Sequence, residues 1–187
     1  LKIVNIFPDN VKSGLPTAPA QVLLIDAKTG LVSAVLDGTY VTQLRTGAAS
    51  GAAFDALARK DAKVGALIGT GGQAATQLEA MLCARNLETV RIFDLDPERL
   101  NAFVERMRQE LGSYGAELIA AASSDEAVEG ADILVTMTPS LKPVFNADKV
   151  KPGCTVSCVG AYQPHMQEMD PKILPRASKI YFASQSA

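Results

Sequence analysis

Residues 66–80 read ALIGTGGQAATQLEA, and this stretch decides which fold the chain adopts. It places Gly69, Gly71 and Ala74 in the pattern Gly-x-Gly-x-x-Ala, between an apolar run and a helical pattern. In a strand–loop–helix unit that binds a dinucleotide, the first glycine permits a tight turn and the second lets the backbone approach the pyrophosphate. The small third residue lets the helix pack closely on the strand. A glycine-rich turn without a ligand explains the same residues, so the motif alone leaves both interpretations open.

The next apolar run strengthens the dinucleotide interpretation. It reads VRIFD and ends at Asp94, about 20 residues after Ala74, which suits a carboxylate that accepts hydrogen bonds from the adenosine ribose. Leu95 and Asp96 follow, in place of an arginine or lysine that could bind a 2′-phosphate. We therefore predict NAD as the cofactor, with NADP disfavoured. Asp94 could instead serve only the N-terminus of the helix that begins at Pro97, although Asp96 suits that capping role better.

Strands and helices alternate from residue 62 onward. Short apolar runs predict six strands, at 64–68, 90–93, 117–121, 133–136, 155–159 and 180–183. Helical spacing and capping residues predict helices between the earlier strands, at 73–85, at 97–111 and after Ser123. This alternation predicts an α/β fold with a doubly wound parallel sheet of the Rossmann type over residues 59–187.

The first 58 residues follow a different pattern. A short strand at 3–7 and a hairpin with strands at 21–26 and 31–36 precede an alanine-rich helix at 38–58. So few strand residues cannot close a core alone. We therefore expect residues 1–58 to be part of an N-terminal α/β domain with a linking helix, and the chain to be a piece of a longer protein.

Composition narrows the possible partners. Apolar residues make up 48% of the chain and charged residues 20%, as in ordinary globular proteins. A net charge of −2 gives no indication of a nucleic-acid or membrane partner. Cys83, Cys154 and Cys158 are too few for a disulfide framework, and we expect a cytoplasmic protein. We interpret Cys154 and Cys158 as small core residues and Cys83 as a helix-packing residue. With His165 as the only histidine, we expect no metal site.

Several stretches in order resemble the ornithine cyclodeaminase/μ-crystallin family. They are LKIVNIFPDN, SGLPT, VLLIDAKTG, LDGTYVTQLRTGAAS, LIGTGGQA, VTMTPS and VKPGCTVSCVGA, and they cover essentially the whole chain. The resemblance implies a nicotinamide cofactor in the Rossmann domain, beside a domain that binds substrate and forms a homodimer. It implies one of three activities: alanine dehydrogenation, reduction of cyclic ketimines or pyrroline-2-carboxylate, or cyclising deamination of ornithine.

The resemblance also implies roles for individual residues. Lys2 and Arg45 are its catalytic residues, which hold the carboxylate of the substrate near the nicotinamide. The cofactor contacts that it implies are Thr17, Arg45, Gly69, Gly71, Gly72, Gln73, Asp94, Thr136, Thr138, Val159 and Gly160. An arginine fork beside a lysine suits an amino-acid carboxylate. Spacing alone favours a simpler view, in which Lys2 lies at a strand edge and Arg45 on a helix surface.

One position departs from the ornithine-cyclising members of the family. Tyr162 stands where they carry an aspartate, and a phenol with a pKa of about 10 is a poor base at neutral pH. The sequence therefore favours an NAD(P)-dependent oxidoreductase that transfers hydride between nicotinamide and Cα of a small amino or imino acid. The alternatives are an ornithine cyclodeaminase and a non-catalytic, μ-crystallin-like ligand-binding protein. His165 could supply a proton, but we favour a solvent-facing loop position for it.

Overall fold

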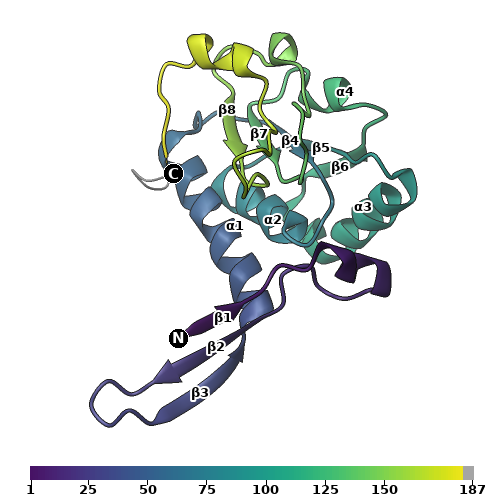
Figure 1. The fold of residues 1–187 in the computed structure, drawn as a ribbon. Coiled ribbons are helices and arrows are strands. Elements are labelled where there is room, and N and C mark those ends of the chain that lie inside the picture. The colour runs from purple at the N-terminus through teal and green to yellow at the C-terminus, as the bar shows by residue number, and fades with distance from the viewer. Residues whose placement is uncertain (183–187) are drawn as a thin grey trace.

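A five-stranded parallel sheet forms the larger part of the computed structural model, which describes residues 1–182 (Figure 1). Its spatial order is β6 (Glu117–Ala120), β5 (Thr89–Phe93), β4 (Val64–Ile68), β7 (Ile133–Thr136) and β8 (Thr155–Cys158). The central strand β4 pairs in parallel with both β5 and β7. The strand order therefore reverses at β4, and the carboxyl ends of β4 and β7 form the crevice where this class of sheet binds ligands.

Helical segments cover both faces of this sheet. Two of them, α2 (Ala74–Ala84) and α3 (Pro97–Leu111), pack on one face. The short α4 (Ser124–Val128), with the 3-10 turns η3 (Ala147–Lys149) and η4 (Pro171–Arg176), covers the other. The doubly wound arrangement predicted from the alternation is confirmed.

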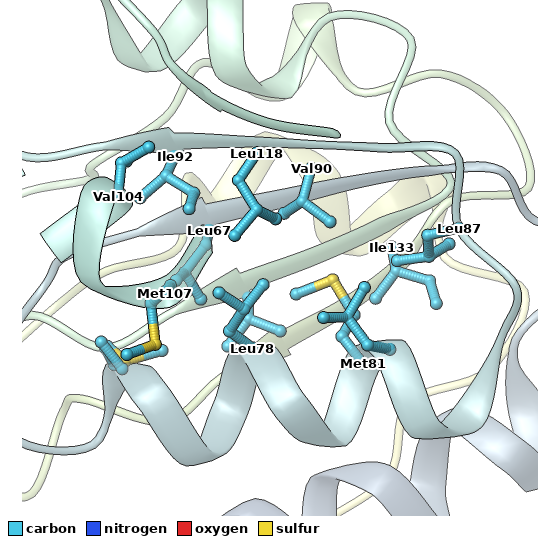
Figure 2. Packing of buried hydrophobic residues seen from close by; sticks show 14 of the residues in the cluster. Leu67, Leu78, Met81, Leu87, Val90, Ile92, Val104, Met107, Leu118 and Ile133 are labelled. Atoms are coloured by element: carbon cyan, nitrogen blue, oxygen red, sulfur yellow. The ribbon is translucent and has the colours of Figure 1, made fainter. Parts of the chain in front are cut away.

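The core between α2, α3 and the sheet is built from aliphatic side chains (Figure 2). Leu78 and Met81 of α2 are fully buried and point toward the strands. The strand residues that they face are Leu67, Val90, Ile92 and Ile133. Burial of each such side chain stabilises the fold by about 1.5–3 kcal/mol, which makes this sheet a rigid base for the loops at its edge.

The first part of the chain forms a separate antiparallel sheet of β1 (Lys2–Val4), β2 (Ala20–Ile25) and β3 (Val32–Asp37), with the 3-10 turn η1 (Pro8–Ser13) between β1 and β2. It lies at the start of α1 (Gly38–Leu57), away from the five-stranded sheet (Figure 1). The Asp37 side chain caps α1 by accepting a hydrogen bond from the Thr39 N–H at 2.9 Å. α1 then packs on α2, where a Cβ at Gly47 would lie 2.5 Å from the Thr76 carbonyl oxygen. α1 therefore joins the two sheets.

Two expectations about this architecture are wrong. Ile180, Tyr181 and Phe182 form no strand, because their side chains are exposed and no ladder reaches them; Ala183 lies outside the described residues. Cys158 is exposed and is not a core residue, whereas Cys154 is half-buried and packs against the core on the α4 side of the sheet, as expected. Cys158 lies on β8, an edge strand with one neighbour. Cys83 lies on α2, and its sulfur is 3.0 Å from the hydroxyl of Tyr114, the last residue of the 3-10 turn η2 (Gly112–Tyr114). Over residues 1–182, no helix combines the length and the hydropathy of a membrane span.

Candidate functional site

The loop at residues 69–73 connects the carboxyl end of β4 to α2. Gly69 has φ +97°, and its N–H donates to the Phe93 carbonyl oxygen at 2.9 Å. A Cβ at Gly69 would lie 2.9 Å from Cγ2 of Thr138. Both the left-handed backbone and the close contact therefore require glycine at this turn.

The next two glycines are not required by packing within the chain. A Cβ at Gly71 would meet no atom within 4 Å, and one at Gly72 would meet only Nε2 of Gln43, at 3.7 Å. The Gln73 side chain does not cap α2, and its Oε1 is buried without a hydrogen-bond partner in the described chain. Uncapped N–H groups at a helix N-terminus attract anions. The open loop therefore fits a pyrophosphate, and Ala74 behind it is fully buried against the sheet.

Asp94 follows β5 and lies directly beside this loop. Its Oδ2 accepts hydrogen bonds from the N–H and Oγ1 of Thr70, at 2.8 and 2.7 Å. Its Oδ1 accepts from the Asp96 N–H at 3.0 Å and from Nη2 of Arg99 at 2.5 Å. Burial raises the pKa of Asp94, but the hydrogen bonds from Arg99, Asp96 and Thr70 outweigh it and hold the pKa below the ordinary 3.8. The carboxylate is therefore charged at neutral pH.

The carboxylate of Glu168 joins the loops that follow β7 and β8. This side chain is 2% exposed. Its Oε1 accepts from the N–H and Oγ1 of Thr138, at 2.5 and 3.0 Å, and its Oε2 accepts from the N–H groups of Gly160 and Ala161, at 2.6 and 3.3 Å. The two loops approach so closely that a Cβ at Gly160 would lie 2.2 Å from the Thr138 nitrogen. Sequence reasoning missed Glu168, because nothing in its spacing marks it as buried.

Thr136 and Val159 complete this edge of the sheet. Thr136 pairs with Cys158 across β7 and β8, and its carbonyl oxygen accepts from the Val159 N–H at 2.8 Å. Oγ1 of Thr136 is buried and has no hydrogen-bond partner among residues 1–182. The predicted cofactor residues of the second part of the chain therefore gather along the carboxyl ends of β4, β5, β7 and β8. They are Gly69, Gly71, Gly72, Gln73, Asp94, Thr136, Thr138, Val159 and Gly160.

The other predicted site residues come from the first part of the chain. Lys2 is exposed on β1 opposite Val22, and Arg45 is exposed on α1. Thr17 is exposed before β2, and its carbonyl oxygen accepts from the Phe7 N–H at 2.8 Å. None of the three donates one of the four hydrogen bonds that reach Asp94.

Tyr162 and His165 lie in the segment between Gly160 and Glu168, and both are exposed. Neither is held against a buried acceptor or donor in the part of the chain that is described. Over the same residues no group of three His, Cys, Asp or Glu side chains is arranged to hold a metal ion.

A sheet that reverses its order at β4, an open glycine loop and a carboxylate beside it define a dinucleotide-binding domain of the Rossmann class. The chain belongs to the ornithine cyclodeaminase/mu-crystallin family, whose model matches residues 1–187.

Relatives of known name agree with this assignment. Delta(1)-pyrroline-2-carboxylate reductase of Bacillus cereus is 37% identical over 187 residues, which are 100% of this chain and 56% of that protein. The same enzyme of Thermococcus litoralis, solved with NADH and L-proline, superposes with a TM-score of 0.85 at 40% identity, covering 90% of this chain and 51% of that one. An archaeal alanine dehydrogenase dimer with bound NAD gives 0.84 at 40% identity, over 94% of this chain and 53% of that one. The chain therefore spans about half the length of its relatives.

Proposed function

We propose that the protein is an NAD(P)-dependent oxidoreductase that transfers hydride between nicotinamide and Cα of a small amino or imino acid. The open loop at Gly71 and Gly72, beside the charged Asp94, is the observation that carries this proposal. The similarity to a pyrroline-2-carboxylate reductase and an alanine dehydrogenase, both solved with the dinucleotide, supports the choice of reaction.

The residues of this chain have distinct tasks in the proposed reaction. The N–H groups at the start of α2 hold the pyrophosphate, and Asp94 orients the adenosine ribose. Thr138 and Gly160, which donate to Glu168, would line the side of the site that holds the nicotinamide. Bound nicotinamide supplies or accepts the hydride. Lys2 and Arg45 hold the substrate carboxylate, as an ammonium point charge and a bidentate fork.

We also propose that the protein is a homodimer and that it is cytoplasmic. An alanine dehydrogenase of similar fold is described as a dimer, which supports this assembly. Three free cysteines suit a reducing compartment.

A cyclodeaminase is the second candidate, and the family description supports it. Tyr162 weighs against it, because an exposed phenol replaces the aspartate that the ornithine-cyclising members carry. The two candidates differ in net redox change: a cyclodeaminase releases ammonia without net oxidation of the dinucleotide.

A substrate panel on the intact protein separates the candidates. We expect pyrroline-2-carboxylate, or pyruvate with ammonia, to oxidise NADH, measured by absorbance. Ammonia release from ornithine with no change in NADH would favour the cyclodeaminase. Tight dinucleotide binding with no turnover of any substrate would favour a ligand-binding protein.

Arg45→Ala tests the residue assignment. We expect kcat/KM to fall by at least about tenfold, because a charge-assisted pair to the carboxylate is lost. Arg106→Ala is the matched control, since this exposed arginine lies on α3, where it faces Glu110. Equal kinetics in both variants would remove Arg45 from the site.

A further inference from the structure

We infer that Arg99 determines how the adenosine end of the site discriminates between NADH and NADPH, by moving between Asp94 and a 2′-phosphate. This inference rests on the proposed function. The sequence alone shows only Leu95 and Asp96 after the carboxylate, and therefore no cation for a phosphate. The structure brings a cation to that place from the first turn of α3, where Arg99 reaches back to Asp94 at 2.5 Å.

The carboxylate of Asp94 has no acceptor position left in this arrangement. A carboxylate offers about four lone-pair sites. Thr70 fills two of them through its N–H and hydroxyl, and Asp96 and Arg99 fill the other two. A ribose hydroxyl can therefore bind Asp94 only when one of these donors leaves.

Arg99 is the donor that leaves most easily. The N–H groups of Thr70 and Asp96 are fixed by the backbone, and the Thr70 side chain belongs to a residue only 7% exposed. The Arg99 side chain is 50% exposed and extends from α3 through several rotatable bonds. Its guanidinium can turn into solvent and keep its hydration, whereas the buried donors would lose theirs.

The consequence differs between the two dinucleotides. With NADH, the ribose 2′-hydroxyl takes the place of Arg99 on Oδ1 of Asp94. With NADPH, the displaced guanidinium lies beside the 2′-phosphate and can bind it with two parallel hydrogen bonds. The charges that face Arg99 are those of Asp94 and Asp96, both negative, so without this arginine a 2′-phosphate would meet only repulsion.

Titration of the intact protein with NADH and with NADPH tests the inference. We expect Arg99→Gln to raise the ratio of the NADPH Kd to the NADH Kd by about tenfold, the loss expected for one charge-assisted hydrogen bond. Binding of NADH should be unchanged or tighter, because Oδ1 of Asp94 becomes free. Arg99→Lys keeps the charge and should keep the ratio within about threefold of the original.

Arg106→Gln is the matched control, since it removes the same charge from α3 at 3.9 Å from Glu110. The inference would be overturned if Arg99→Gln changed the ratio of the NADPH Kd to the NADH Kd no more than the control does, or weakened both dinucleotides equally. The proposed function would stand in either case. Binding of neither dinucleotide by the unsubstituted protein would overturn the proposed function itself. Circular dichroism of each variant confirms that it is folded.

Discussion

The two sheets of this molecule differ in the burial of their apolar side chains. In the five-stranded sheet, every residue of β7 is buried between helical layers. In the sheet of β1, β2 and β3, only Ala20 is buried, and Leu24 and Val35 are 57% and 63% exposed. The five-stranded sheet is stabilised by contacts within the described chain, whereas the three-stranded sheet exposes its apolar residues.

This difference has a counterpart in the candidate site. The cofactor half stands at the edge of the buried sheet, where Asp94 and Glu168 each accept four hydrogen bonds. The residues proposed to bind substrate, Lys2 and Arg45, are exposed. Dinucleotide binding and substrate turnover should therefore respond to different substitutions.

The largest expected effect comes from comparing Leu78 of α2, which packs on the buried sheet, with Leu24 of the exposed sheet. Leu78→Ala opens a cavity in the core of Figure 2 and should lower the free energy of unfolding by about 2–5 kcal/mol. Leu24→Ala, on the exposed sheet, should change it by less than about 0.5 kcal/mol. Urea unfolding followed by circular dichroism measures both. A large loss in Leu24→Ala would mean that this sheet is buried against a partner in solution, and the comparison would fail.

Two glycines near the site should separate stability from binding. A Cβ at Gly160 would overlap the Thr138 backbone, so Gly160→Ala should lower the free energy of unfolding by about 3 kcal/mol. Gly71→Ala places its methyl in open space and should leave unfolding unchanged, yet weaken NADH binding because the loop must approach the pyrophosphate. Calorimetric titration with NADH provides the second measurement. If Gly71→Ala binds NADH as the unsubstituted protein does, the loop is only a turn.

The sequence predicts most elements of both parts of the molecule, since the hairpin and helix expected in residues 1–58 are found as β2, β3 and α1. Alternating apolar runs and capping residues identify β4 to β8 and the helices between them, because these signals are local. The strand expected at 180–183 fails for the opposite reason: Ile180 and Phe182 are apolar, but a strand also needs a neighbour. The local sequence favours an extended conformation, but a strand forms only where a neighbouring strand accepts and donates its backbone hydrogen bonds.

The site shows the same limit. The sequence identifies Gly69 and Asp94 as candidate site residues because their spacing is fixed by one strand–loop–helix unit. It does not identify Glu168 and Arg99, since Glu168 meets Thr138 across 30 residues and Arg99 acts from a helix face that many arginines share. Long-range hydrogen bonds leave no spacing rule in a sequence.

Glu168→Gln should have a smaller effect than the glycine clash. The amide keeps one acceptor oxygen but turns an NH₂ group toward N–H donors, so buried donors lose their partner at a cost of about 2 kcal/mol. NADH binding should weaken as well, because Thr138 and Gly160 are no longer held together. Glu129→Gln is the control, as it removes only the exposed ion pair with Lys149. Equal behaviour of the two variants would show that Glu168 does not position these loops.

The smallest expected effect is a dependence of stability on pH, carried by Asp132. Burial raises the pKa of this carboxyl, but hydrogen bonds from Lys151 and from the N–H groups of Lys63 and Val64 outweigh it and hold the pKa below 3.8. The unfolded chain therefore binds the proton first, so this contribution is present above pH 3.8 and is lost as pH falls through the folded pKa.

Asp26 is the matched residue in the exposed sheet. Hydrogen bonds from Thr29 and Lys28 also hold the pKa of Asp26 below 3.8, although the carboxyl is fully solvated. Urea unfolding of the protein at pH 5 and pH 3 should show less acid destabilisation for Asp132→Asn than for Asp26→Asn, because only the buried carboxylate leaves donors without water when it is protonated. The same acid response in both variants would mean that the two sheets do not differ in how they hold charge, although they differ in how they hold apolar surface.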